Sequence, residues 1–374
     1  MPKRILMIID GLPGGGAEKV VLTLCQGLMS AGHSVSLFSL RNICDYAIPP
    51  GLDFRIIADN SRRPWRKLTE HHRRAASLDK AIYQSEISDG KYALIFSHLH
   101  KTDRIVSRCR TLDPLKTWYC LHGVFSVSYL KNRRGFSHWL KQVKIRRLYQ
   151  RRQIVAVSQY VLDDLIDCFG VKPSNAKVIG SPFDFENIQQ LAQQYFPLEG
   201  SDYLLHIGRF HEVKRHDRLL EAYASSGITA PLILLGQGSK ESERRLRLLA
   251  EQLGIDKRVR FEGFQRNPYP WIRHARMVIV SSDSEGFGNV LIEALSCQTP
   301  VVSTRCPGGP VSILTGTLAR GLAESNAVSL AEKMREIYDN PPDLKNIRLD
   351  AYSIGTVCER YLQLAGAEPG RTTL

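Results

Sequence analysis

The chain has 374 residues, of which 43% are hydrophobic and 24% are charged. This balance is typical of a globular protein, and the length suits two domains better than one. Lysine and arginine exceed aspartate and glutamate by 51 − 37 = 14, which favours an anionic partner such as a nucleic acid, an acidic membrane surface or a phosphorylated substrate.

The cysteines and the apolar runs limit the cellular locations that the sequence favours. The eight cysteines are scattered and form no CxxC pair, so neither a zinc site nor a disulfide framework is indicated and a reducing compartment is favoured. The first residues, MPKRILMIID, are too short an apolar stretch for a signal peptide. No run approaches the roughly 20 apolar residues of a membrane span. We therefore expect a protein in solution or on a membrane surface.

The first half of the chain alternates predicted strands with helices. Residues 3–10 form an apolar strand that leads into the glycine-rich loop GLPGGGAE at 11–18 and then a helix. A glycine run in this context binds phosphate or lets a ligand approach, although the spacing is not GxGxxG and a plain turn stays possible. The further strands are 33–40, 54–58, 92–98, 117–123, 154–158 and 177–180. This alternation predicts a parallel doubly wound sheet.

Two basic segments interrupt this half. Arg62–Arg74 holds six Arg or Lys, and Lys131–Arg152 holds nine and no acid. In the second segment, Phe136, Trp139 and other apolar residues recur at near-helical spacing among the cations. Such a helix can lie on an anionic bilayer, or it can pack on the sheet with a solvated cationic face. The sequence leaves both alternatives open.

A second alternation follows a polar, glutamine-rich stretch at 182–200. The predicted strands of this half are 203–208, 232–235, 259–263, 277–282 and 301–304, and the helices are 217–225, 241–253, 271–275 and 326–339. The pattern predicts another doubly wound sheet. Its strand-end loops should converge where such sheets bind ligands.

Three of those loops contain residues that suit a diphosphate and a base. Arg209 and Lys214 follow the first strand, and the two cations can grip a diphosphate, unless they are ordinary surface charges. A glycine turn at 236–238 lets the backbone approach a ligand. The segment 263–266, which contains Phe264 and Gln265, can cover a base.

The fourth loop, DSEGFG at 283–288, is the most informative one. Gly286 and Gly288 permit a sharp turn, and the helix that starts near Asn289 offers free amides to an anion. Glu285 and Glu293 can accept hydrogen bonds from hydroxyls. Amides for phosphate and carboxylates for hydroxyls suit a nucleotide sugar. The alternative is that both acids only complement the helix dipole.

Together these motifs carry a resemblance to a known family. GGGAE, GRFHEVKRHDRLLEAY, GQG, FEGF and SEGFGNVLIEALSCQTPVVST resemble the retaining GT-B glycosyltransferases of family four. The segment CPGGP at Cys306–Pro310 is similar to the subset that builds bacterial surface polysaccharides and lipopolysaccharide. The resemblance implies two facing Rossmann-like α/β domains with a cleft between them. The expected divisions are an acceptor domain at 1–182, a linker at 183–200, a donor domain at 201–350 and a closing helix within 351–374 that returns to the first domain.

The resemblance also assigns roles to single residues. Arg209 and Lys214 would neutralise the leaving diphosphate in place of a metal, and Glu285 would bind sugar hydroxyls and Glu293 the ribose. His122, in the strand-end motif LHG, would contact the donor sugar, unless it is a structural histidine. The remaining expected donor contacts are Gly15, Gly16, Gly236, Phe264, Gln265, Gly286, Phe287, Gly288, Asn289 and Val290.

The implied activity is transfer of a hexose or N-acetylhexosamine from a UDP-sugar, without a metal or other cofactor. The implied acceptor is lipid-linked or a lipopolysaccharide at the cytoplasmic face of the inner membrane, where the two basic segments would bind the anionic surface. A GT-B epimerase is one alternative. A basic nucleic-acid-binding protein is another, although no nucleic-acid module is recognisable.

Overall fold

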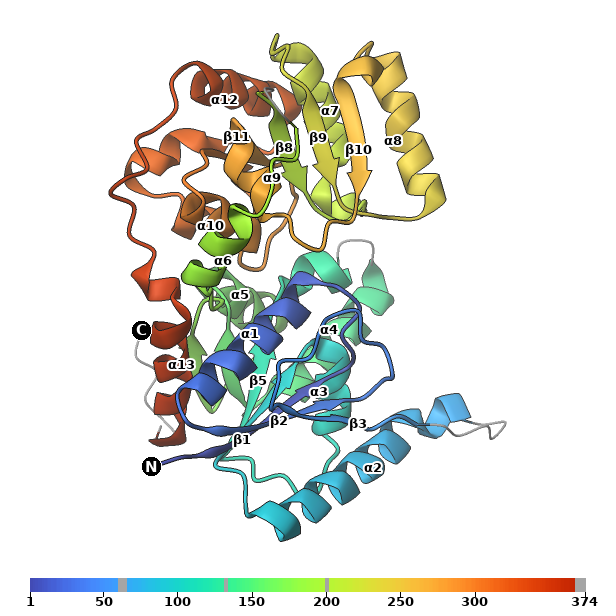
Figure 1. The fold of residues 1–374 in the computed structure, drawn as a ribbon. Helices are drawn as coiled ribbons and strands as arrows, with labels where there is room; N and C mark the ends of the chain where they lie inside the picture. The colour runs from blue at the N-terminus through green and yellow to red at the C-terminus, as the bar shows by residue number, and fades with distance from the viewer. Residues whose placement is uncertain (60–65, 131–133, 199–201, 367–374) are drawn as a thin grey trace. The chain divides into compact units, whose positions relative to one another are not determined.

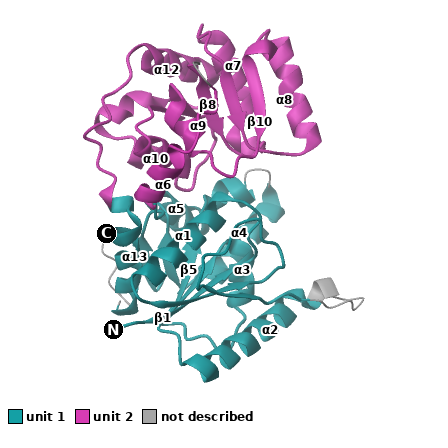
Figure 2. Ribbon diagram, in the orientation of Figure 1, with its two compact units in different colours: residues 1–183, 351–374 teal, residues 184–350 magenta. Residues whose placement is uncertain are grey.

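A computed structural model describes residues 1–59, 66–130, 134–198 and 202–366. The chain divides into two compact units (Figure 2). Unit 1 comprises Met1–Phe183 and Ala351–Leu374, and unit 2 comprises Asp184–Asp350. Each unit is built on its own parallel sheet, so the predicted fold class of two parallel α/β sheets is confirmed.

Unit 1 contains a seven-stranded sheet in the order β3-β2-β1-β4-β5-β6-β7 (Figure 1). Strand β1 (Arg4–Ile9) lies inside the sheet and is an unbroken apolar run after Arg4, as expected for a parallel strand covered on both faces. The other strands are β2 (Ser34–Ser39), β3 (Asp53–Ile56), β4 (Leu94–His98), β5 (Thr117–Leu121), β6 (Gln153–Ala156) and β7 (Asn175–Val178).

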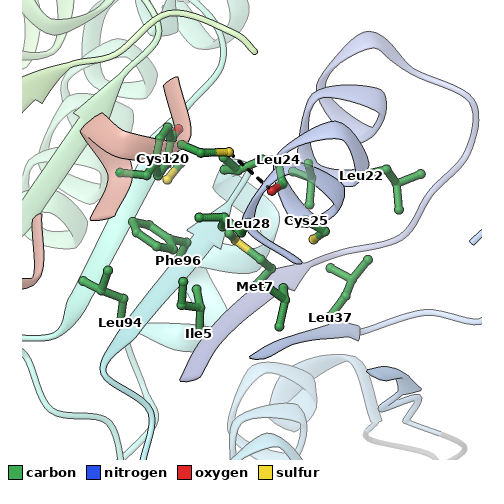
Figure 3. Packing of buried hydrophobic residues seen from close by; sticks show 14 of the residues in the cluster. Ile5, Met7, Leu22, Leu24, Cys25, Leu28, Leu37, Leu94, Phe96 and Cys120 are labelled. Atoms are coloured by element: carbon green, nitrogen blue, oxygen red, sulfur yellow. Dashed lines mark hydrogen bonds between the residues drawn. The ribbon is translucent and has the colours of Figure 1, made fainter. Parts of the chain in front are cut away.

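The helices of unit 1 cover this sheet. In α1 (Gly16–Ser30), Leu24 and Leu28 are fully buried one turn apart and pack with Met7 and Phe96 of the sheet (Figure 3). The other helices are α2 (Arg66–Asp89), α3 (His100–Val106), α4 (Gly135–Tyr149), α5 (Gln159–Asp163) and α13 (Ile354–Leu362), with π-helical turns η1 (Ser126–Leu130) and η2 (Asp164–Cys168) and 3-10 turns η6 (Asp350–Tyr352) and η7 (Gln363–Gly366).

The end of the chain packs on its beginning. Helix α13 lies against α1, and Gly27 makes the close approach possible. A Cβ atom at Gly27 would lie 2.5 Å from Cγ1 of Ile354 and 2.7 Å from Sγ of Cys358. Residues from this helix therefore belong to the core of unit 1.

Unit 2 contains a six-stranded parallel sheet in the order β10-β9-β8-β11-β12-β13. Its strands are β8 (Leu204–Ile207), β9 (Leu232–Leu235), β10 (Val259–Gly263), β11 (Met277–Val280), β12 (Val301–Thr304) and β13 (Leu322–Ala323). Its helices are α6 (Phe185–Ala192), α7 (His216–Ser225), α8 (Lys240–Gln252), α9 (Tyr269–His274), α10 (Asn289–Ser296), α11 (Pro310–Ile313) and α12 (Ala327–Asp339), with 3-10 turns η3 (Glu212–Lys214), η4 (Asp256–Arg258) and η5 (Gly316–Gly321).

The elements of unit 2 that the sequence did not predict include β13 and α6. Strand β13 has two residues, which is too short to leave a periodic signal in the sequence. The polar stretch after Pro182 contains α6, whose first turn is capped by the Asp184 carboxylate and which packs against α9. Helix formation there depends on a cap and on tertiary packing more than on an apolar pattern. Among the helices of the described part of the chain, none is both long and apolar enough to cross a membrane.

Candidate active site

Three strand-end loops of unit 2 are joined by backbone contacts. The Gly236 amide donates to the Gly263 carbonyl at 2.8 Å, and the Gly208 amide donates to the Leu235 carbonyl at 2.9 Å. A Cβ atom at Gly236, whose φ is +142°, would lie 2.0 Å from the Gly208 carbonyl oxygen. Glycine is therefore required where these loops meet at the carboxyl ends of β8, β9 and β10.

An ammonium and a carboxylate meet at the same edge of the sheet. Lys214 follows β8 and Glu285 follows β11, and their side chains pair at 2.7 Å between Nζ and Oε1. The side chains are 27% and 13% exposed, so the pair is mostly shielded but reachable. The Ser282 hydroxyl donates to the same carboxylate oxygen. The fold thus joins two predicted site residues that lie 71 positions apart.

A buried arginine ties the two loops together. The Arg218 side chain is 6% exposed, and it donates to the Ser281 carbonyl at 2.9 Å and to Asp283 Oδ1 at 2.7 Å. Arg215 also pairs with Asp283, at 3.1 Å, and with Asp217. Sequence reasoning missed this clamp, because the two arginines look like ordinary charges at the start of α7.

Arg215 adopts an uncommon backbone conformation beside this clamp. Its φ of +49° and ψ of +50° place it in the left-handed region, which costs a residue with a side chain roughly 1–2 kcal/mol. The ion pairs of its guanidinium with Asp217 and Asp283 hold it there. The chain turns at this residue directly after Lys214.

The glycine pair of the CPGGP segment packs on the backbone of the Glu285 loop. The Glu285 amide donates to the Pro307 carbonyl at 3.0 Å, and the Gly309 amide donates back to the Glu285 carbonyl at 3.2 Å. A Cβ atom would lie 1.4 Å from the Glu285 oxygen at Gly308, and 1.7 Å from the Phe287 oxygen at Gly309. Only glycine fits at either position, so this segment fixes the course of the loop.

Helix α10 begins directly after that loop. Gly288 precedes the helix with φ of +94°, and the buried Oδ1 atom of Asn289 has no hydrogen-bond partner among the described residues. Glu293, one turn further, is 7% exposed and accepts a hydrogen bond from the Tyr269 hydroxyl at 3.3 Å. Val290 is half-buried.

The remaining predicted residues of unit 2 differ in their exposure. Phe264 is 48% exposed, and the Gln265 side chain donates to the Glu262 carbonyl at 2.8 Å. Arg209 is exposed and forms no ion pair with a described residue. Gly286 is half-buried and Phe287 is buried.

The glycines predicted in unit 1 lie at the start of α1. Gly15 precedes the helix in an extended conformation, and its carbonyl accepts a hydrogen bond from the Tyr46 hydroxyl at 2.9 Å. Gly16 is the first helical residue and is exposed.

His122 follows β5 in unit 1, and a second histidine holds it. Its Nε2 atom lies 3.0 Å from Nδ1 of His98, which is fully buried. Burial lowers the pKa of His122 to about 4 and holds the pKa of His98 well below its ordinary value. Both rings are therefore neutral, and a single N–H lies between the two nitrogens. The Nε2 atom of His98 lies 3.4 Å from the Met7 sulfur, which can only accept. The His122 Nδ1 atom is therefore left as a hydrogen-bond acceptor. Sequence reasoning missed His98, which ends the apolar strand β4.

The two parallel α/β units, of seven and six strands, form the GT-B-like fold that solved glycosyltransferase structures share. The family model "Glycosyl transferases group 1" matches residues 187–353, and the model "Glycosyltransferase Family 4" matches residues 14–187. The chain therefore belongs to glycosyltransferase family 4 and uses a nucleotide sugar, which confirms the expected family.

Curated relatives and solved structures agree with this assignment. The chain is 28% identical over 313 residues, 81% of this chain and 80% of the other, to a Campylobacter jejuni N-acetylgalactosamine-N,N'-diacetylbacillosaminyl-diphospho-undecaprenol 4-alpha-N-acetylgalactosaminyltransferase. It is 32% identical over 174 residues, 44% of this chain and 50% of the other, to the lipopolysaccharide core biosynthesis glycosyltransferase LpsE of Rhizobium meliloti. The crystal structure of Anabaena Alr3699/HepE with UDP and glucose has a TM-score of 0.75 at 18% identity, covering 97% of this chain and 99% of that one.

Proposed function

We propose that this protein is a retaining, metal-independent glycosyltransferase that moves a hexose or N-acetylhexosamine from a UDP-sugar to a lipid-linked or lipopolysaccharide acceptor. The observation that carries the proposal is the Lys214–Glu285 pair at the strand ends of unit 2. The solved relative that contains UDP supports the choice of nucleotide. The C. jejuni relative, which by its name acts on a diphospho-undecaprenol substrate, supports the acceptor class.

The pair can serve both halves of the donor. When a UDP-sugar binds, the Lys214 ammonium exchanges the carboxylate for the diphosphate, and Glu285 becomes free to accept hydrogen bonds from sugar hydroxyls. The Ser282 hydroxyl keeps Glu285 in place during the exchange. As the glycosyl bond breaks, negative charge grows on the diphosphate, and Lys214 stabilises it together with Arg209, which forms no ion pair with a described residue.

The other residues of unit 2 supply positioning. Glu293, oriented by Tyr269, accepts hydrogen bonds from the ribose hydroxyls, and the exposed Phe264 ring covers the base. The start of α10 and the Asn289 amide oxygen, which has no hydrogen-bond partner among the described residues, provide further polar contacts. In unit 1, His122 offers its Nδ1 atom to a hydroxyl of the donor sugar.

A donor screen tests this function. We expect UDP release from one UDP-sugar in the presence of extracted lipid acceptor and EDTA, with a glycosylated product of retained anomeric configuration. Lys214→Ala and Glu293→Ala should each lower kcat/KM about 100-fold or more, the range for removing one group that stabilises transition-state charge or positions the donor. The matched controls Lys257→Ala and Glu241→Ala change exposed residues of unit 2 and should keep wild-type activity. Full activity in both site variants would contradict the proposal, and an epimerised nucleotide sugar would favour the epimerase.

We also propose that α4 binds the anionic membrane surface. Phe136 and Trp139 are 74% and 55% exposed, and their rings stack at 5.5 Å between centroids. The exposed Arg147 lies on the same side of the helix, whereas Tyr149 faces the core. Apolar rings next to cations on an outward face suit the interface of an acidic bilayer.

The described cations of the first basic segment have internal partners instead. Arg73 pairs with Asp59 at 2.6 Å, and Arg74 lies 3.5 Å from the Asp10 carboxylate and is 10% exposed. The part of this segment from 62 to 65 lies outside the described residues, and so do the side chains of residues 66–68. The membrane proposal therefore rests on α4.

Vesicle sedimentation tests the membrane contact. The double variant Phe136→Ser with Trp139→Ser should bind vesicles containing anionic lipid at least tenfold more weakly than wild type, because the two exposed rings supply most of the buried apolar area. Val328→Ser changes an exposed apolar residue of unit 2 and should leave binding unchanged. Equal binding by the double variant would exclude α4 as the contact.

A further inference from the structure

A buried hydrogen-bond chain in unit 1 ends on a histidine that the donor site does not use. His100 begins α3 directly after β4, and its Nδ1 atom lies 3.1 Å from the Tyr149 hydroxyl. That hydroxyl donates to Asp103 Oδ2 at 2.6 Å, and the Ser97 hydroxyl donates to Asp103 Oδ1 at 2.5 Å. Ser97, Asp103 and Tyr149 are all fully buried, whereas His100 is half-buried.

The chain fixes which nitrogen of His100 carries the proton. Where Asp103 is ionised, Tyr149 gives its one hydroxyl proton to that carboxylate, so the Tyr149 oxygen accepts the Nδ1 proton of His100. The Nε2 atom of His100 is then a bare acceptor, and it has no hydrogen-bond partner among the described residues.

The pKa values of Asp103 and His100 support this direction of the hydrogen bonds above neutral pH. Burial raises the pKa of Asp103 to about 8, so the carboxylate is ionised in more alkaline solution. Burial, with smaller effects of Lys141 and Arg104, lowers the pKa of His100 to about 3, so its ring stays neutral there.

The backbone and the surrounding rings also hold His100 in place. Leu99 has φ of +75° and ψ of +139°, a strained conformation that costs a residue with a side chain about 1–3 kcal/mol. The ring of His100 lies 4.8 Å from that of Tyr129 and 5.5 Å from that of Phe125. Strain of this kind gathers at binding sites, and the residue stands at the strand-end edge where such sheets bind ligands.

We propose that His100 binds the acceptor, its Nε2 atom accepting a hydrogen bond from a hydroxyl of the sugar that receives the glycosyl group. Tyr149 and Asp103 are positioning residues that orient the ring and keep Nε2 free of a proton. The Tyr129 ring flanks the bound sugar. This inference rests on the proposed function, and it goes beyond it because the donor residues Lys214, Glu285 and Glu293 belong to unit 2.

A pair of substitutions separates hydroxyl binding from packing. The amide of glutamine can place an oxygen near the Nε2 position, whereas asparagine reaches only the Nδ1 position. At pH 9, His100→Asn should raise the KM for the acceptor and lower the ratio of transfer to acceptor-free UDP-sugar hydrolysis, each about tenfold, the value of one lost hydrogen bond. His100→Gln should recover part of both. His72→Ala, an exposed histidine of α2, is the matched control.

Nitrogen-15 NMR of the histidines reports which nitrogen of His100 carries the proton, and it needs no substrate. We expect His100 of the wild type at pH 9 to be the Nδ1–H tautomer, and Tyr149→Phe, which keeps the ring packing, to shift it toward Nε2–H. Tyr149→Phe should also lower the ratio of transfer to hydrolysis, and it should have little further effect in the His100→Asn background.

The outcomes distinguish this inference from the function on which it rests. A wild type that neither transfers nor hydrolyses any UDP-sugar overturns the proposed function and the acceptor role together. A wild type that transfers normally, with acceptor KM and transfer ratio unaltered in His100→Asn, overturns the acceptor role alone. An equal loss of hydrolysis and transfer in His100→Asn would place the residue on the donor side and would also contradict the inference.

Discussion

At the scale of single residues, the candidate site depends on charged side chains whose positions are fixed by ion pairs and hydrogen bonds with other charged side chains. The Lys214–Glu285 pair is formed by two loops, and the Arg218 guanidinium connects them through two carbonyls and one carboxylate of the loop after β11. A buried guanidinium with such partners fixes geometry well, because every donor it leaves unpaired costs free energy. Arg218 therefore acts on the donor through Lys214 and Glu285 rather than by touching it.

This positioning role predicts a coupling between Arg218 and Lys214. Arg218→Met should lower kcat/KM for the UDP-sugar about tenfold, and the loss should largely disappear when Lys214 is already alanine, because residues in one network are not additive. Steady-state kinetics on the double-mutant cycle measure this, with Arg247→Met, a half-exposed arginine of α8, as the control. Independent, additive losses would mean that Arg218 only stabilises the fold.

At the scale of elements, glycines at two places in the fold let two parts of the backbone approach each other, because glycine has no side chain. Gly308 and Gly309 bring the CPGGP segment onto the Glu285 loop, and Gly27 brings α13 onto α1. Only the first pair is marked by a motif in the sequence. Gly27 sits in an ordinary helical pattern, and its role follows from what packs against it.

The helix pair offers a matched test. Gly27→Ala should lower the free energy of unfolding by about 1–3 kcal/mol, because the added methyl group overpacks Ile354 and Cys358. Gly355→Ala, on α13 itself, meets nothing within 4 Å and should be neutral or stabilising through helix propensity. Urea unfolding followed by circular dichroism compares the two. Equal effects at both positions would show that the α1–α13 contact is looser than described.

At the scale of the whole molecule, the two units differ in how the chain builds them. Unit 2 is one continuous segment with a core of its own, and it contains Lys214, Glu285 and Glu293. Unit 1 needs both ends of the chain, since Val357 and Tyr361 belong to its core. The centroid of the Tyr361 ring lies 5.1 Å from that of the Phe96 ring.

This difference predicts how fragments behave. Residues 184–350 alone should fold cooperatively and bind UDP without transferring sugar, because their apolar core and the donor residues lie in that segment. Residues 1–183 alone should be less stable than the same unit with 351–374 supplied in trans, since the missing helix leaves core surface exposed to water. Calorimetry and UDP titration measure both. A fragment 184–350 that stays unfolded would contradict the independence of unit 2.

The sequence alone was sufficient for the fold class, most strand positions and the family. Buried parallel strands are continuous apolar runs such as 5–9 and 277–280, and glycine-rich loops follow both of these runs in the sequence. These are local signals, readable at a spacing of a few residues. The roles of the candidate site residues stay predictions that the donor screen will test.

Contacts between residues distant in the chain were decided only by the tertiary structure. The pairing of Lys214 with Glu285, the Arg218 clamp, the contact of His98 with His122 and the hydrogen bonds of Tyr149 with His100 and Asp103 each join different elements. No periodic pattern marks such a partner, because a hydrogen bond depends on where two side chains end in space. Packing of the sheets and helices places those ends within reach, and the chemistry of the site follows from that packing.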